Sequence, residues 1–282
     1  MKNRQRNHTL SKKKPLLSML FSILTAALVC ALGSSLGSSD IGQYLLLSVA
    51  AVLCLLAHKL WFSPQFKGFF KPEIPFREIG ILCLPFLVQL LLSWLLNVID
   101  YGRFFKASRL SIAMALSAGF GEETMFRGLA IPIGMRYIKG KNKILTAALF
   151  TSVIFGLSHL GNIKVGANVG MAVVQAAATI GTGLLYAAIC LRTGSILITI
   201  VMHSLYDWMC FVTNPVMQEG SMAGLGVSFT IIVSLFSDLS MGIAGYCMIR
   251  LAVREKIEEV WQMKWQDYAV EAEADSAHQG KR

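Results

Sequence analysis

Residues 15–37 read PLLSMLFSILTAALVCALGSSLG, a run without any charged side chain. A predominantly apolar segment of about 20 residues can cross the hydrocarbon core of a bilayer as an α-helix, because the helix satisfies its backbone amides internally. Further apolar windows follow along the whole chain. We expect them to form spans at about 41–62, 78–99, 108–134, 143–163, 169–191, 195–213 and 226–249. The sequence therefore predicts an all-α fold, a polytopic transmembrane helical bundle of about eight helices.

The composition of the chain agrees with a membrane protein. Of its 282 residues 55% are hydrophobic and 15% are charged, and the mean hydropathy is +0.58. A soluble domain carries about 25% charged residues. The composition therefore argues against a soluble nucleotide-binding enzyme, a secreted disulfide scaffold and a disordered regulator. The six cysteines show no CxxC spacing and no pairing with histidine that suggests a zinc site.

The basic residues indicate topology and not a nucleic-acid partner. The net charge is +10 and the pI is about 9.4, but Lys and Arg occur in short clusters beside apolar runs, and no base-reading module is visible. With the N-terminus in the cytoplasm, 21 of the 26 Lys and Arg residues fall on the inner side. We therefore expect the lipid bilayer as a partner and a multi-pass protein with both termini inside. Short basic loops without sorting signals favour a bacterial plasma membrane. The basic residues at 103–109 lie on the wrong side in this scheme.

Four segments follow from these patterns. Residues 1–14 form a basic cytoplasmic tail, 15–107 the N-terminal transmembrane helices, 108–249 a catalytic transmembrane bundle, and 250–282 an amphipathic helix with a polar tail. The first span is expected to stay uncleaved, because its apolar run is too long for a signal peptide. The amphipathic helix either lies in the membrane interface or docks on the loops of the bundle. Its apolar face contains Ile257, Val260, Trp261, Trp265 and Tyr268.

Ionisable residues interrupt the fourth predicted span, which reads Gly121-Glu122-Glu123-Thr124-Met125-Phe126-Arg127. Each charged residue at the centre of a membrane helix costs about 2.5–3.5 kcal/mol on insertion scales. Glu123 and Arg127 are four residues apart, so they can form a structural ion pair along the helix. Glu122 points about 100° away from them, so its carboxylate must face water or a group from another span.

Two later spans supply polar groups that could meet Glu122. His159 lies in the span at 143–163, and His203 and Asp207 share one face of the span at 195–213. Polar residues can simply hold membrane helices together. This explanation suits single residues such as His159 or Asp238, but helix packing does not require so many ionisable groups together. The set therefore favours catalysis or ion translocation.

These residues resemble the motifs of the CPBP family of intramembrane proteases, which includes type II CAAX prenyl endopeptidases and the bacterial Abi proteins. The family pattern is EExxxR, then FxxxH, then HxxxN or HxxxD, each on its own transmembrane helix. In this sequence the three motifs are 122–127, 155–159 and 203–207, and every fixed position is filled. The resemblance covers about residues 108–213.

The resemblance implies hydrolysis of a peptide bond in a polar cavity within the membrane. It implies that Glu122 is the general base on a water that His159 also holds, and that His203 stabilises the oxyanion or binds a metal. We expect Glu123 to have two roles, one as a catalytic residue and one in the structural ion pair with Arg127. The substrate would be a membrane-associated peptide or a lipidated protein.

Position 207 leaves two mechanisms open. An ionised Asp207 can only accept a hydrogen bond, whereas an Asn can also donate one to an oxyanion. In one mechanism Asp207 is protonated or orients His203, and no metal is needed. In the other, His159, His203 and Asp207 bind zinc while Glu122 activates the metal-bound water. The sequence favours this second mechanism, that of a metalloendopeptidase, because two histidines and a carboxylate are a familiar catalytic zinc set.

Two other classes of protein remain as alternatives. An ion- or proton-coupled transporter would also carry Glu and His within its spans, and glycines at 166, 170, 181 and 183 could break the sixth span. These glycines more readily suit close helix packing, with Gly166 and Gly170 at GxxxG spacing. A non-catalytic bacteriocin-immunity protein is the third class, although intact glutamates and histidines argue against it.

Overall fold

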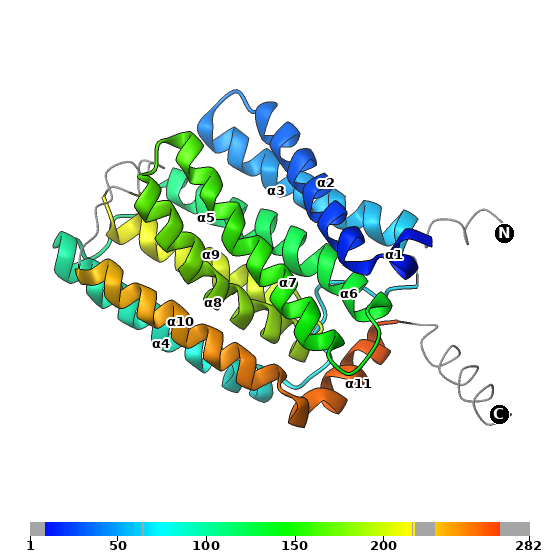
Figure 1. Ribbon diagram of the computed structural model, residues 1–282. Helices are drawn as coiled ribbons and strands as arrows, with labels where there is room; N and C mark the ends of the chain where they lie inside the picture. Colours follow the sequence, from blue (N-terminus) through cyan, green and yellow to red (C-terminus); the bar gives the residue numbers. More distant parts are fainter. Residues whose placement is uncertain (1–8, 64, 216, 218–228, 266–282) are drawn as a thin grey trace, which may run out of the picture.

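The computed structural model describes residues 9–63, 65–215, 217 and 229–265. In this part of the chain the secondary structure is helical, and the only β-type pairing is an isolated bridge between Phe66 and Trp265. Figure 1 shows a bundle of long helices, with α1 and α11 at the same end. The predicted polytopic helical membrane bundle is confirmed.

The helices follow one another with short links. In chain order they are α1 (Thr9–Lys13), α2 (Pro15–Ser35), α3 (Asp40–Ala57), the π-helix η2 (His58–Phe62), α4 (Phe76–Tyr101), α5 (Arg109–Glu123), the π-helix η3 (Thr124–Ala130), α6 (Ile131–Tyr137), α7 (Lys143–Ser158), the 3₁₀ helix η4 (His159–Val165), α8 (Val169–Thr193), α9 (Leu197–Thr213), α10 (Phe229–Ile249), the 3₁₀ helix η6 (Leu251–Val253) and α11 (Arg254–Lys264).

Local sequence explains several helix ends. Ser108 and Ser111 form a capping box at the start of α5, and the side chain of Asn168 accepts a hydrogen bond from the Met171 amide at the start of α8. Gly194 ends α8 in the left-handed conformation, with φ +69°, which favours glycine.

The structure confirms the membrane bundle but not the predicted count of eight spans. Among the described residues, five helices are long and apolar enough to cross a membrane, and a bent pair of α10 and α11 segments would make six. The window at 108–134 is helical but contains charged residues near its middle. The α9 helix has 17 residues, which span about 25 Å at 1.5 Å per residue and so fall short of a 30 Å core.

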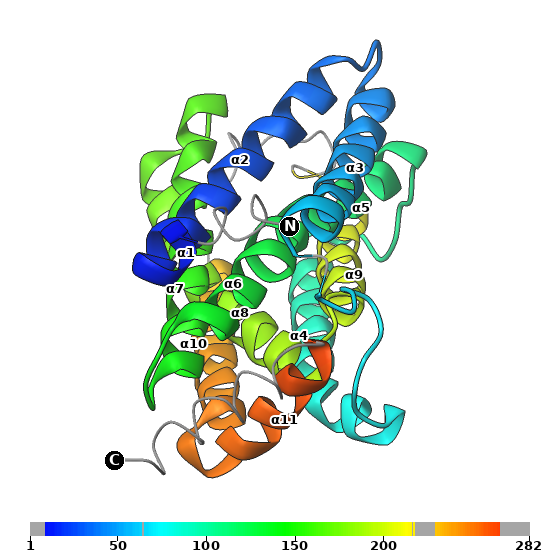
Figure 2. The same ribbon diagram turned by 90° about the vertical axis from the view of Figure 1, so that its right-hand side faces the viewer.

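Helix α8 lies in the centre of the bundle. It packs on α7 and α10, while α9 packs on α5, and α2 packs on α3. Figures 1 and 2 show α2 and α3 on one side of the bundle and α4 and α10 on the other. The side chains of Leu185 to Leu191 on α8 are almost completely buried. Because of this central position, α8 contacts helices on several sides of the bundle.

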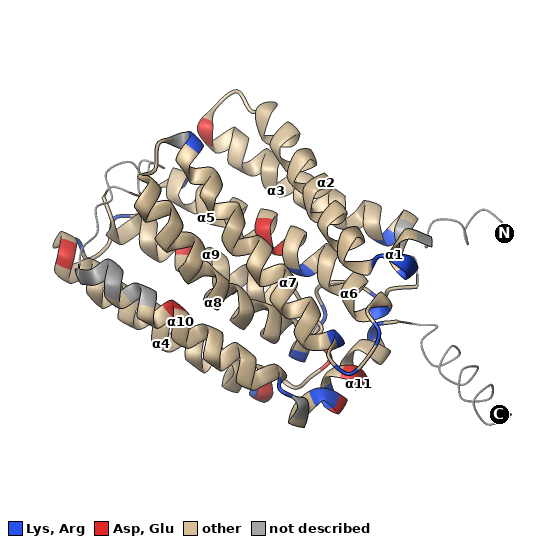
Figure 3. Cartoon of the chain, in the orientation of Figure 1, with Lys and Arg blue, Asp and Glu red and all other residues tan. Residues whose placement is uncertain are grey.

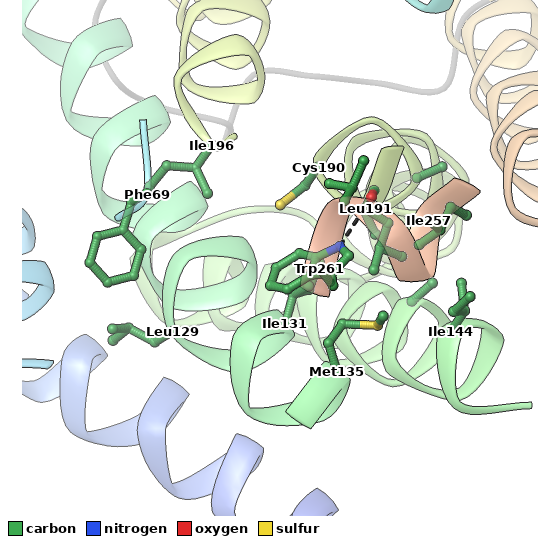
Figure 4. Close-up of a cluster of buried hydrophobic side chains, with 14 of the residues drawn as sticks. Phe69, Leu129, Ile131, Met135, Ile144, Cys190, Leu191, Ile196, Ile257 and Trp261 are labelled. Atoms are coloured by element: carbon green, nitrogen blue, oxygen red, sulfur yellow. Dashed lines mark hydrogen bonds between the residues drawn. The ribbon is translucent and has the colours of Figure 1, made fainter. Parts of the chain in front are cut away.

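The amphipathic helix docks on the bundle and does not lie free at its surface. Figure 4 shows Ile257 and Trp261 of α11 among buried apolar side chains, and Trp261 Nε1 donates a hydrogen bond to the Leu191 carbonyl at 3.0 Å. Lys264 is 1% exposed and donates to the carbonyls of Gly68 and Lys71. Of the two placements that the sequence leaves open, the structure shows docking. Tyr268 lies outside the described residues.

Burial lowers the pKa of Lys264, and Glu73, whose carboxylate lies 3.3 Å away, opposes this shift. The charge of the buried Lys264 ammonium group is therefore compensated by the Gly68 and Lys71 carbonyls and by the Glu73 carboxylate. This contact connects α11 to the segment between η2 and α4.

The predicted division into four segments stays a prediction. Residues 266–282, which include the polar tail, lie outside the described residues. In the described part, α2 packs on η3 and α3 packs on α5, so the N-terminal helices are in contact with the segment that carries the motifs.

Candidate active site

The two glutamates lie at the end of α5, where the helix changes to the π-helix η3. Such π segments are rare and are frequent at functional sites. Glu123 is completely buried, and the side chain of Glu122 is 32% exposed. The same dipeptide therefore supplies one carboxylate to the interior and one to a more accessible position.

Glu123 and Arg127 form the predicted ion pair. Arg127 Nη1 donates to Glu123 Oε1 at 2.9 Å, and neither side chain is exposed. Arg127 Nη2 donates to the Gly183 carbonyl of α8 at 2.9 Å, and the guanidinium lies 4.6 Å from the centre of the Phe155 ring. The pair thus connects η3 with α7 and α8. A buried ion pair is stable only when further hydrogen bonds satisfy its remaining polar atoms, and the Gly183 carbonyl supplies one of them.

His203 connects the two glutamates. Its Nδ1 lies 2.9 Å from Glu123 Oε1, the same oxygen that accepts from Arg127. Because a carboxylate only accepts, Nδ1 carries the proton in this contact. His203 Nε2 lies 3.7 Å from Glu122 Oε2 and 3.6 Å from Asp207 Oδ2. The imidazole therefore has one nitrogen bonded to the buried ion pair and the other facing two accessible carboxylates.

Each of the two glutamates has one oxygen, Oε2, that is buried and has no hydrogen-bond partner among the described residues. Only the Glu122 side chain is partly exposed, whereas Glu123 is held in the ion pair with Arg127. Asp207, whose side chain is 25% exposed, faces the same nitrogen of His203. A carboxylate without a protein donor, beside a histidine, is suited to accept a proton from a water molecule.

His159 lies at the end of α7, beside the group but not in its hydrogen-bond network. Its Nδ1 is 2.9 Å from the Phe155 carbonyl. The ring of Phe155 is 5.0 Å from that of His159 and 5.9 Å from that of His203. The structure thus brings Glu122, Glu123, His203 and Asp207 together directly, and His159 adjoins them through Phe155.

The donors have part of the pattern of a zinc site. Histidines that bind zinc through Nε2 commonly donate their other N–H to a carboxylate or a carbonyl, and His159 and His203 make such contacts. In the part of the chain that the structure describes, however, no three His, Cys, Asp or Glu side chains are grouped so that they could hold a metal ion. Zinc at His159, His203 and Asp207 stays a prediction.

Three residues around the site were not singled out for it from the sequence. A Cβ on Gly119 would lie 2.1 Å from Ser204 Oγ and 2.8 Å from the Ile200 carbonyl oxygen, so this glycine permits the close approach of α9 to α5. Gly183 provides the acceptor for Arg127. Tyr186 is 1% exposed and its ring lies 5.6 Å from that of His203. Of these three, Gly119 had the one visible signal in the sequence, because it lies two residues before Gly121 and close to the glutamates.

Of the four glycines expected to suit close helix packing, two have that role and two do not. Gly166 ends η4 with φ +99°, and Gly170 is in the first turn of α8, near the Asn168 side chain. The GxxxG interpretation of this pair is therefore wrong. Close packing occurs, as predicted, at Gly181, where a Cβ would lie 2.1 Å from the Asp238 carbonyl oxygen, and at Gly183. Helix α8 continues past both glycines without a break.

Asp238 of α10 belongs to a separate polar group. Its Oδ1 atom accepts hydrogen bonds from Thr182 Oγ1 at 3.0 Å and from Gln89 Nε2. These partners come from α8 and α4. The contacts agree with a role in helix packing, which the sequence left open for this residue.

Comparison with protein families adds an independent finding. Residues 105–209 match the family model described as "Type II CAAX prenyl endopeptidase Rce1-like". This segment, which is less than half of the chain, is similar to the Rce1-like family. It contains all three motifs of the predicted resemblance, which is thereby confirmed. The curated proteins give no match, and the solved structures give none either.

The Rce1-like assignment supports, at the level of the family, a CAAX-type intramembrane endopeptidase. Together with the apolar helices it identifies a multi-pass membrane protein. A protease embedded in a membrane has the bilayer and a peptide substrate as its partners.

Proposed function

We propose that the chain hydrolyses a peptide bond of a membrane-associated substrate with a water molecule that Glu122 activates. The observation that carries this proposal is the position of His203 between Glu123 on one nitrogen and Glu122 with Asp207 on the other. Such an arrangement separates a structural carboxylate from a reactive one.

In this mechanism Glu122 accepts a proton from water while the water oxygen attacks the carbonyl carbon of the substrate. The negative charge moves to the carbonyl oxygen, and a protonated His203 Nε2 stabilises it by donating a hydrogen bond. Glu122 then returns the proton to the nitrogen of the leaving amine as the C–N bond breaks. Water supplies the hydroxyl group of one product and the proton of the other, so all atoms are accounted for.

Glu123 acts as a positioning residue for His203. The Arg127 guanidinium compensates its charge, and the Gly183 carbonyl holds the guanidinium in place. Glu123 can therefore fix the orientation and the protonated nitrogen of His203 without serving as the base. His159, beside the same Phe155 ring, is proposed to hold the attacking water.

Zinc is the alternative for the same residues. Bound by His159, His203 and Asp207, it would supply a Lewis acid that lowers the pKa of a bound water. The described positions favour the mechanism without it, because His203 Nε2 faces two carboxylates and the three ligands are not grouped.

The proposed location is a bacterial plasma membrane.

The decisive experiment compares Glu122→Gln with the wild type in lipid nanodiscs. The substrates are peptides with a farnesylated cysteine near the C-terminus and the same peptides without the lipid. The glutamine keeps the size of the side chain but cannot accept the proton, so we expect a loss of about 10²–10⁴-fold in turnover and normal accumulation in the membrane.

Asp238→Asn is the matched control, since it changes another carboxylate within the bundle that has its own partners. It should cleave the same peptides at nearly the wild-type rate. Wild-type turnover in the Glu122→Gln protein would overturn the assignment of the base. A wild-type protein inactive on both peptide forms would overturn the substrate class instead.

A further inference from the structure

Two basic clusters that are far apart in the sequence lie at the same end of the bundle. The first is Lys12, Lys13 and Lys14, at the end of α1 and before α2. The second is Lys139 and Lys141, between α6 and α7. Helix α1 contacts α6, so the clusters are neighbours. We call these five lysines the basic patch. Figure 3 shows the concentration of Lys and Arg at this end, where α1, α6 and α11 lie.

The five lysines are accessible and uncompensated. All of them are exposed, and none forms an ion pair within the described part of the chain. No acidic residue occurs in the sequence at 9–15 or 138–143. The neighbouring Lys143, in contrast, lies 3.5 Å from Glu258. Mutual repulsion of exposed, uncompensated charges is relieved by an anionic partner.

The membrane spans fix the depth of the patch. Two candidate spans begin at Pro15 and Lys143, directly beside the two clusters. The lysines therefore lie where the apolar part of each helix begins, which is the level of the lipid headgroups. Apolar side chains continue from there along α2, where Leu17 and Phe21 are 48% and 65% exposed. This surface offers cations to a headgroup and apolar contacts to its acyl chains.

We propose that the basic patch binds the phosphate groups of anionic phospholipids and thereby stabilises the fold. The effect would extend to the catalytic segment, because Met19 of α2 packs in one buried cluster with Phe126 and Ala130 of η3. An occupied patch fixes the start of α2 and so favours its contact with the helix that carries Arg127. This inference does not depend on the proposed proteolysis.

The test measures thermal unfolding of the full-length protein in nanodiscs of phosphatidylcholine, with and without phosphatidylglycerol. The anionic lipid should raise the unfolding midpoint of the wild type by several degrees, since a ligand that binds only the folded state stabilises it. About 0.5 M salt should remove most of this rise, because it screens exposed charges. Equal midpoints of the wild type in both lipids would overturn the proposal.

Variants locate the response. Lys139→Gln/Lys141→Gln leaves the N-terminal charges intact, and it should lose a large part of the rise. The corresponding Arg double variant keeps the charge and should keep the rise. Arg109→Gln/Lys164→Gln removes two exposed charges outside the patch and serves as the matched control. An identical response in the glutamine variant and the wild type, or an equal loss in the control, would show that the patch does not bind the lipid.

Discussion

Two polar groups within the helical bundle use carboxylates in different ways. One, the glutamate–histidine cluster, consists of Glu122, Glu123, Arg127, His203 and Asp207 on α5, η3 and α9. Here an ion pair compensates one carboxylate, and two further carboxylates face the free nitrogen of the histidine. The arrangement contains more acceptors than its protein donors can satisfy.

The other group, the Asp238 cluster, consists of Gln89, Thr182 and Asp238 on α4, α8 and α10. It has a single carboxylate, and Gln89 and Thr182, which donate hydrogen bonds to it, are neutral. Under the proposed mechanism, a carboxylate within a span does not by itself indicate catalysis. A catalytic group needs a reactive carboxylate that the protein leaves without a donor, beside a second group that is held in place.

Glu123→Ala should have the largest effect, because it removes the compensation of a completely buried Arg127. Breaking a buried ion pair in this way costs about 3–5 kcal/mol. We expect low accumulation in the membrane and loss of cleavage, and quantitative blotting with a turnover assay measures both. Normal accumulation with a purely catalytic loss would move Glu123 from a positioning to a catalytic role.

Gly119→Ala should have the next largest effect. The new Cβ would overlap the Ile200 carbonyl and Ser204, so α9 must move away from α5 and take His203 with it. Overpacking of this kind costs about 1–3 kcal/mol, and a displacement of about 1 Å at a reacting group can cost 10²-fold in rate. We expect kcat to fall more than KM changes, with a shifted pH profile.

Gly33→Ala is the control for this prediction. Its Cβ would lie 2.7 Å from Ala50 Cβ, between α2 and α3 and away from the glutamate–histidine cluster. It should lower stability to a similar degree without changing kcat or the pH profile. Equal kinetic effects of the two variants would show that Gly119 contributes to stability alone.

The sequence predicts the membrane fold and the pairing of residues within one helix better than the contacts between helices. Local patterns suffice for α2, expected at 15–37 and found at Pro15–Ser35, and for the Glu123–Arg127 pair four residues apart. The π-helix at Thr124–Ala130 has no such signal. The Gly183 acceptor of Arg127 is 56 residues away. Contacts over such separations depend on how helices pack, which periodicity within one helix does not determine.

Asp207→Asn distinguishes the two mechanisms and should have a smaller effect. Asp207 faces His203 Nε2 at 3.6 Å, and an amide in its place can donate a hydrogen bond to the oxyanion. Without a metal, turnover should persist or rise. If Asp207 binds zinc, removal of a charged ligand should lower metal content and turnover together. Elemental analysis and turnover measured on the same sample decide between the two.

Asp238→Asn should have the smallest effect. The amide keeps an oxygen that can accept from Thr182, so the loss should stay near 1 kcal/mol, the typical net value of a hydrogen bond. Cleavage should remain within a few-fold of the wild type, as measured by turnover and thermal unfolding in the same nanodiscs. A loss as large as that of Glu122→Gln would remove the distinction between the two clusters. Asp238 would then have to exchange a proton during turnover, because its neutral analogue retains the packing contacts but cannot ionise.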